Sequence, residues 1–364
     1  MQEDFHYYAT YCASLLAGYS HKDSLDIAYS SQFVDMCSRT LLARIKGPSD
    51  AATTQLRLEL MEARTDPVGL QDITRIWASF HFLPKDLKAE KKKCTKYYLD
   101  KYRLICGPNG DLAVKTVELA KGKPVQSVGI AMHVLADTWA HANFAGTPSL
   151  VINNTNYVFY ELLPKGDGFW ERQIRFVHRT SEPDDLEKSV YTNSLFQSSE
   201  NSIMNLGHGR AGHLPDYSFV RFKYLPAWGE YAEIIKDNPS DYEKAFSQMI
   251  SALKYIRGAV PSFEKEMYDT EAVAPYKERI QDIIGKRQLL ASNDWKAFGE
   301  ELSGAAIEDF SIDRYFDEYT SAAGKEKDDT FIGKFIRGAI VHKGMVIGEL
   351  MKSGNKLAGA VREH

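Results

Sequence analysis

The chain has 364 residues, of which 44% are hydrophobic and 26% are charged, as in a globular protein of one large domain or two ordinary ones. Its net charge is −4, and Lys and Arg are scattered among Asp and Glu, so the charge gives no support for nucleic-acid binding. The opening Met-Gln-Glu-Asp-Phe-His is acidic and no long apolar run follows it. We therefore predict no signal peptide, no transmembrane segment and a cytoplasmic location.

Helix is the dominant pattern along the chain. A capping box at Ser20–Asp23 predicts a helix that runs to about Leu42, and a second capping box at Ser240–Glu243 predicts a helix after it. Pro183 is predicted in the first turn of another helix. Two further helices are predicted over Ser292–Leu302 and Thr330–Met351. The best strand candidate, Asn154–Leu163, is short. We therefore predict an all-α fold, with a helical metal-binding domain over residues 1–260 and a helical C-terminal extension over 261–364 packed on it.

The four cysteines are spread along the chain without a C-x-x-C pair, at Cys12, Cys37, Cys94 and Cys106. Zinc fingers and disulfide frameworks need closer or paired spacings, so these residues are interpreted as reduced thiols.

One apolar segment, residues 129–144, carries His133, Asp137 and His141 at intervals of four. Residues at i, i+4 and i+8 share one helical face, with a drift of roughly 40° per step. The rest of the segment is mostly Ala, Met, Val, Leu, Trp and Phe, so this helix is predicted to be buried. Buried His and Asp side chains are costly unless paired or bound to metal, so the pattern predicts a metal site in a helical core. A helix-end role for His141, favoured by the helix dipole, is the alternative.

The ten histidines divide into two groups. Six lie in apolar or Gly-rich settings and are candidate ligands: His6, His81, His133, His141, His208 and His213. The other four lie among charged or terminal residues and are predicted at the surface: His21, His178, His342 and His364. Some candidates have a simpler structural interpretation, since an isolated His81 is typical of a hydrogen-bonded core histidine and Asp35 is compatible with a helix contact.

Three carboxylates complete the set of candidate ligands: Asp35, Asp137 and Asp216. Imidazole and carboxylate ligands together suit Zn, Fe or Mn better than Ca or Mg. Because the set is too large for one tetrahedral ion, we predict two or three metal ions, with zinc as the first expectation and Fe or Mn as alternatives.

The segment from Ala131 to His141 resembles the central metal-binding helix of zinc-dependent phospholipase C and the S1/P1 nucleases, which share an all-helical trinuclear-zinc fold. In that family a His-x-x-x-Asp pair lies on one helix, where the His binds one zinc and the Asp spans two. His133 and Asp137 match this pair, and His141 matches the later His that binds the remaining zinc. The final ligand pair is matched by His213 and Asp216, with His208 as a competitor.

The same resemblance implies the outer ligands by their order along the chain. His6 matches a ligand on an early helix, Asp35 matches an Asp often assigned as the base for the attacking water, and His81 matches the next His. Family members begin the mature chain with a Trp whose amino group and carbonyl bind metal. Here five residues precede His6 and none is Trp, so the resemblance offers no match for that ligand.

The resemblance implies a metal-dependent hydrolase that cleaves a phosphoester or phosphodiester, of the phospholipid or nucleotide type, with a metal-activated water. The expected substrate is a small-molecule or lipid phosphoester. Arg210, in the Gly-rich loop, is a candidate substrate contact, and a solvated loop charge is its alternative. Two other function classes stay open: a helical scaffold or binding protein with a structural metal site, and a different metal-dependent enzyme such as an oxidoreductase. The latter lacks the paired Glu-x-x-His motifs of di-iron carboxylate proteins.

Overall fold

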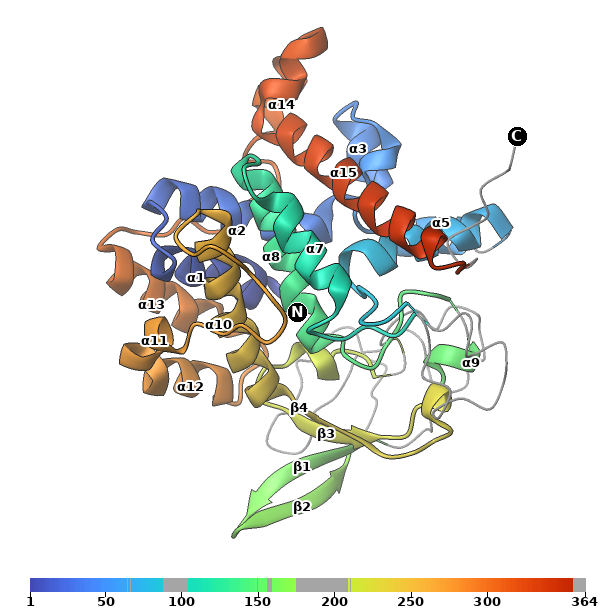
Figure 1. The fold of residues 1–364 in the computed structure, drawn as a ribbon, viewed down its shortest axis with the longest axis vertical. Coiled ribbons are helices and arrows are strands. Elements are labelled where there is room, and N and C mark those ends of the chain that lie inside the picture. Colours follow the sequence, from blue (N-terminus) through green and yellow to red (C-terminus); the bar gives the residue numbers. More distant parts are fainter. Residues whose placement is uncertain are drawn as a thin grey trace.

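The computed structural model describes residues 1–63, 65, 67–87, 104–148, 150–155, 159–174, 209 and 211–355. Within these residues the protein is mostly helical and has one small sheet (Figure 1). The α-helices are α1 (Thr10–Leu16), α2 (His21–Met36), α3 (Arg39–Arg44), α4 (Arg57–Ala63), α5 (Pro67–Phe80), α7 (Asp111–Ala120), α8 (Val125–Ala140), α9 (Leu150–Asn153), α10 (Asn238–Ile256), α11 (Thr270–Val273), α12 (Lys277–Gly285), α13 (Ser292–Ser303), α14 (Phe316–Ser321) and α15 (Phe331–Lys352). The other helical elements are short, namely the π-helical η1 (Asp4–Ala9) and the 3₁₀ helices η2 (Ser49–Ala51), η4 (Leu214–Asp216), η5 (Ala227–Gly229), η6 (Ala274–Tyr276) and η7 (Gly324–Asp329).

Helix α8 is the central helix of the protein, and α2, α7, α10 and α15 all pack against it (Figure 1). Every residue from Val128 to Ala140 is buried, as expected for a helix that is apolar on most of its circumference. The predicted buried helix around His133 is therefore confirmed. The prediction placed all three candidate ligands on the helix, but the helix ends at Ala140 and His141 is its C-cap residue.

The contact between α2 and α8 depends on a glycine. A Cβ atom on Gly129 would lie 2.4 Å from the carbonyl oxygen of Ile27 and 2.9 Å from the backbone nitrogen of Ser31. No side chain fits there, so glycine lets the backbones of the two helices approach directly. The close approach brings Ser31, and Asp35 one turn later, against the part of α8 that carries His133.

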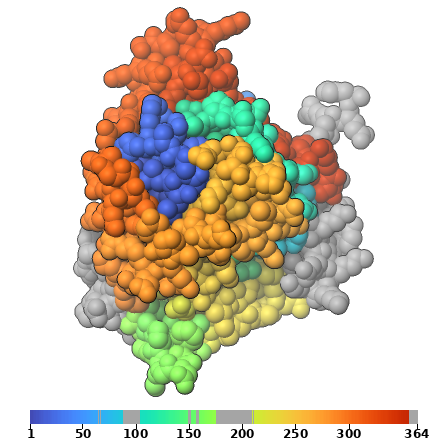
Figure 2. Space-filling view, turned by 60° about the vertical axis from the view of Figure 1, so that its left-hand side comes forward, coloured from blue at the N-terminus to red at the C-terminus, as the bar shows by residue number. Residues whose placement is uncertain are grey.

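The N-terminal segment enters the core as the turn η1, which continues directly into α1. All six residues of η1 are buried. Asp4 holds its beginning, because its carboxylate accepts hydrogen bonds from the backbone N–H groups of Phe5 (2.8 Å) and Ala291 (2.9 Å). The second bond ties the N-terminus to the residue before α13, and the N-terminal helices (blue) border the orange C-terminal helices in Figure 2. Short π-helical turns are rare and often occur at functional sites, and this one carries His6.

A four-stranded antiparallel sheet lies beside the helical body, in the order β2-β1-β3-β4. The strands are β1 (Tyr160–Lys165), β2 (Gly168–Gln173), β3 (Arg221–Tyr224) and β4 (Ile234–Asp237). Leu163 of β1 pairs with Trp170 of β2 in the hairpin that projects at the bottom of Figure 1. The all-α prediction is therefore wrong in this part, although the fold is mostly helical. Strand β2 has no buried side chain, so it lacks the alternation that would have revealed it.

The predicted helix starts are of mixed accuracy. The side chain of Ser20 accepts the N–H of Asp23 at the start of α2, as predicted, but the helix ends at Met36 and α3 follows as a separate helix. Helix α10 begins before the predicted cap, because Asp237 and not Ser240 is its N-cap. The helices predicted over Ser292–Leu302 and Thr330–Met351 are confirmed. Pro183 lies outside the described residues.

The C-terminal helix α15 packs against α8 and α5. Gly338 permits a close contact there, since a Cβ atom on it would lie 2.8 Å from Ser127 Oγ. The division into domains at residue 260 stays a prediction. None of the helices in the described residues combines the length and apolarity needed to cross a membrane.

Candidate metal centre

Four separate segments bring polar side chains to the C-terminal half of α8. Turn η1 carries His6, α2 carries Asp35, the residue after α5 is His81, and η4 carries Asp216. Helix α8 itself supplies His133, Asp137 and, at its C-cap, His141. Two overlapping groups place one ligand atom of each member within 4.8 Å of the others: His6, His133 and Asp137 form one, and Asp35, His81 and His133 form the other.

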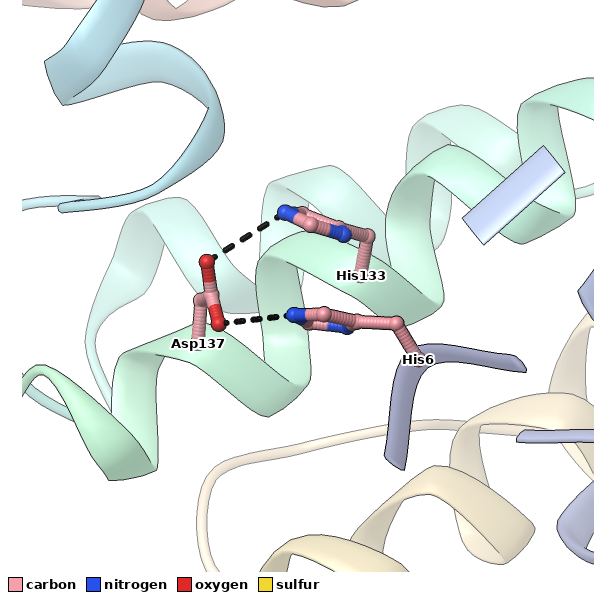
Figure 3. A group of neighbouring side chains, drawn as sticks. All are labelled: His6, His133 and Asp137. Atoms are coloured by element: carbon pink, nitrogen blue, oxygen red, sulfur yellow. Dashed lines mark ion pairs between the residues drawn. The ribbon is translucent and has the colours of Figure 1, made fainter. Parts of the chain in front are cut away.

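The Asp137 carboxylate lies in the middle of this cluster. Its Oδ1 atom is 3.2 Å from His6 Nε2, whereas its Oδ2 atom is 3.2 Å from His133 Nε2 (Figure 3). The same Oδ2 atom is 3.4 Å from His81 Nδ1. The two oxygens of one carboxylate thus contact different histidines. Such a carboxylate is placed to be shared between two cations.

Backbone carbonyl groups orient three of the imidazole rings. The Nδ1 atom of His133 lies 2.9 Å from the Ser31 carbonyl oxygen, and the Nε2 atom of His81 lies 3.0 Å from that of Thr53. The Nδ1 atom of His141 lies 2.7 Å from the His81 carbonyl oxygen. Since a carbonyl only accepts, each of these nitrogens carries the proton in the neutral ring. The lone pair is then on the other nitrogen, which faces the cluster, as in most protein metal ligands.

Burial and charge together set the protonation states that metal binding needs. Burial lowers the pKa of both His6 and His133 to about 4, so these rings are neutral at pH 7. Burial pushes the pKa of Asp137 upward, but His141, the Met1 amine and the other histidines outweigh it and hold the pKa well below its usual range. Neutral imidazoles around an ionised carboxylate are the forms that bind a metal cation.

A positive charge already occupies part of the cluster, since the amino group of Met1 lies there. Its nitrogen is 2.7 Å from Asp137 Oδ1, 3.3 Å from Asp216 Oδ1 and 3.3 Å from His141 Nε2. Burial lowers the pKa of this amine, but the surrounding carboxylates raise it to about 11. These groups therefore stabilise a cation in this position. Sequence reasoning missed this contact, because a pattern of side chains does not reveal the position of a main-chain amine. The resemblance did not supply it either, since the chain has no Trp at the position where the family has its amino-terminal ligand.

The cluster is most accessible at Asp35. Its side chain is 27% exposed, whereas those of His6 and His133 are fully buried. Asp35 Oδ1 lies 3.7 Å from His81 Nδ1 and 3.9 Å from His133 Nε2. Burial raises the pKa of the Asp35 carboxyl above its usual value. Asp35 is therefore the most exposed carboxylate of the cluster.

The structure brings most of the predicted site residues together. His6, Asp35, His81, His133, Asp137, His141 and Asp216 are all in the cluster, whereas His213 lies at its edge. The His213 side chain is 49% exposed and its Nδ1 atom is 3.2 Å from Asp216 Oδ2. His208 and Arg210 lie outside the described residues.

Two other sequence interpretations can be checked here. His342, predicted at the surface, is buried, and its Nε2 atom donates to the Ser79 carbonyl oxygen at 2.8 Å. The prediction gave too much weight to the adjacent Lys343, because the apolar Ile340 and Val341 precede His342 in the same helix. Cys12, Cys37 and Cys106 are free buried thiols, and Cys94 lies outside the described residues.

Comparisons with known proteins place the chain in a family without assigning an activity. No curated protein and no solved structure matches it. One family model covers residues 1–350, which is almost the whole chain. The protein therefore belongs to DUF6765, a family of unknown function.

Proposed function

We propose that this protein is a metal-dependent hydrolase, with two or three zinc ions, that cleaves a phosphoester or phosphodiester. The observation that carries the proposal is the Asp137 carboxylate, whose two oxygens contact different histidines of the cluster. A structural zinc site needs only four ligands around one ion, and this cluster offers more donors than that. The resemblance of residues 131–141 to the phospholipase C and S1/P1 nuclease helix supports the same interpretation.

Each cluster residue has a proposed role. His6, His133 and Asp137 would hold one ion, Asp35 and His81 would contribute to a second, and Asp137 would be shared. His141 and Asp216 lie around the Met1 amine and are the proposed ligands of a third position. Bound zinc would lower the pKa of a coordinated water and neutralise the charge that develops on the phosphoryl oxygens.

The residues of the chain would position the reactants. Asp35 is the most exposed carboxylate of the cluster, so it is the proposed group that orients the attacking water and accepts its proton. The backbone carbonyls of Ser31, Thr53 and His81 keep the rings in place while the substrate binds. A small-molecule or lipid phosphoester is the proposed substrate, reached from the Asp35 side.

The main competing function is a helical scaffold with a structural metal site. A structural site is closed by protein ligands, whereas a catalytic site keeps a position open for water or substrate. The partial exposure of Asp35 favours the catalytic alternative. No described residue set favours an oxidoreductase.

Elemental analysis combined with hydrolysis of bis(p-nitrophenyl) phosphate tests the proposal. We expect two or three zinc, iron or manganese ions per chain, and activity that is lost with a chelator and restored with zinc. Asp137→Asn should lower both the metal content and the rate. Asp35→Asn keeps an oxygen donor for the second ion but loses the base, so it should retain most of the metal and lose at least a hundredfold in rate.

His342→Gln is the matched control, because His342 is a buried histidine outside the cluster. It should keep the metal content and the rate. A protein that contains no transition metal after purification without chelator would contradict the proposed metal centre. A fully metal-loaded protein that hydrolyses no phosphodiester or phosphomonoester would leave the metal centre standing and refute the proposed reaction in favour of the scaffold.

A further inference from the structure

A pocket of about 300 Å³ opens between α7, α8 and α15, away from the metal centre. Each helix contributes one face. Residues 116, 119, 120 and 123 run from α7 into the following turn, residues 124, 127, 130 and 131 run from the N-cap of α8 to its middle, and residues 334, 337, 338, 341 and 342 belong to α15. These spacings of three and four place each set on one side of its helix. The pocket has the size of a small-molecule site.

Three cations surround this pocket, namely Lys123, Lys334 and Arg337. Within the described part of the chain none of them pairs with a carboxylate, and no Asp or Glu is among the pocket residues. Like charges that converge without a counter-charge repel one another, so an anion bound between them would be stabilised.

The N-terminus of α8 adds to this positive potential. Pro124 precedes the helix and provides no side-chain cap, and both Pro124 and Ser127 line the pocket. The unpaired N–H groups of a helix N-terminus and its dipole favour a phosphate group.

Aliphatic and uncharged polar side chains make up the rest of the pocket wall. Leu119, Ile130 and Val341 supply aliphatic surface, and Val341 is 52% exposed. The polar side chains are those of Ser127, His342 and Thr116. Thr116 is 2% exposed, and its Oγ1 atom has no hydrogen-bond partner among the described residues. A buried hydroxyl without a partner is costly, and a polar atom of a bound molecule would satisfy it.

We propose that this pocket binds a phosphate monoester that carries a short alkyl or acyl chain. The phosphate lies between Lys334, Arg337 and Lys123 at the N-terminus of α8, and the chain lies along the aliphatic wall toward Thr116. Two lysines and an arginine together suit a dianion better than a carboxylate. The inference does not depend on the metal centre, because it uses no residue of that cluster.

Isothermal titration with hexyl phosphate tests the proposal, on metal-loaded protein and on protein treated with a chelator. We expect binding of one molecule in the chelated protein, at least tenfold tighter than inorganic phosphate. Titration with dihexanoyl phosphatidic acid distinguishes a lipid headgroup from a free phosphate ester as the natural ligand. If phosphatidic acid binds as tightly as hexyl phosphate, the natural ligand is a lipid headgroup. If only hexyl phosphate binds, the natural ligand is a free phosphate ester. Either result supports the pocket.

Variants assign the binding to this pocket. Lys334→Gln with Arg337→Gln should weaken hexyl phosphate at least tenfold. Lys277→Gln with Arg279→Gln makes the same charge change on exposed residues of α12 and should leave the affinity unchanged. Thr116→Val keeps the shape, so it should raise the melting temperature of the free protein while weakening hexyl phosphate severalfold.

Three results would overturn the proposal. The first is equal affinity for hexyl phosphate and inorganic phosphate, which would show that the aliphatic wall does not contribute to binding. The second is unchanged binding by the Lys334→Gln, Arg337→Gln protein. The third is binding that disappears with the metal, which would place the ligand at the metal centre.

Discussion

Gly129→Ala tests the coupling between helix packing and the metal centre. The added Cβ atom would lie 2.4 Å from the Ile27 carbonyl oxygen and 2.5 Å from Ser30 Cβ. Ordinary carbon–oxygen contacts are about 3.3 Å or longer, so α2 and α8 must move apart by roughly 1 Å. Overpacking of this kind costs about 1–3 kcal/mol, which exceeds the gain of up to about 1 kcal/mol from replacing Gly by Ala in a helix. We expect a net loss of up to about 2 kcal/mol in the free energy of unfolding.

The same movement should weaken metal binding. The Ser31 carbonyl oxygen lies on α2 and accepts from His133 Nδ1 at 2.9 Å, so a separation of the helices lengthens this bond. Loss of a hydrogen bond that orients a metal ligand typically costs 10–100-fold in affinity. Urea unfolding of the metal-free protein measures the first effect, and zinc titration against a competing chelator measures the second.

Gly344→Ala is the control, because a Cβ atom there has no neighbour within 4 Å in α15. It should stabilise the protein by about 0.5–1 kcal/mol and leave zinc affinity unchanged. If Gly129→Ala behaves like Gly344→Ala in both assays, the backbone approach of α2 and α8 does not support the metal centre and the reasoning fails.

Two further predictions concern buried groups outside the cluster. Burial lowers the pKa of His342 to about 4. As the pH is lowered from 6.5 to 4, the unfolded chain therefore binds a proton that the folded protein does not, and the folded protein becomes less stable. Between pH 7 and pH 5 the His342→Gln variant should therefore lose about 2 kcal/mol less stability than the original protein, as measured by urea unfolding. An unchanged pH dependence would refute this. Lys236 is 2% exposed and donates to the Trp139 carbonyl oxygen (2.7 Å) and to Asp241 (2.5 Å). Lys236→Met should cost about 2 kcal/mol in thermal or urea unfolding, and a variant as stable as the original would show that the C-terminal end of α8 needs no donor.

The central helix was the most predictable part of the protein. Its apolar composition and the spacing of His133 and Asp137 are local properties, and a buried helix with polar groups on one face follows from them. The sheet was not predictable in the same way. Its strands have four to six residues, and β1 contains Pro164 near its end, so neither length nor alternation separates them from loops.

The outer cluster residues were predicted from their order along the chain and their residue types. Their convergence is a tertiary result, since Ser31 and His133 are 102 positions apart and Met1 and Asp137 are 136 apart. His342 shows the converse error, because it was assigned to the surface beside Lys343 although Ile340 and Val341 precede it, and its side chain is buried.

The sequence by itself determined that a buried helix carries His133 and Asp137, because periodicity and apolar composition decide burial locally. Tertiary structure alone decided which oxygen of Asp137 contacts which histidine and which ring nitrogen faces the cluster. It also decided that the Met1 amine lies beside Asp137. These features depend on backbone carbonyls and on a backbone contact at Gly129. Because main-chain groups are the same at nearly every position, a pattern of residue types does not predict such contacts.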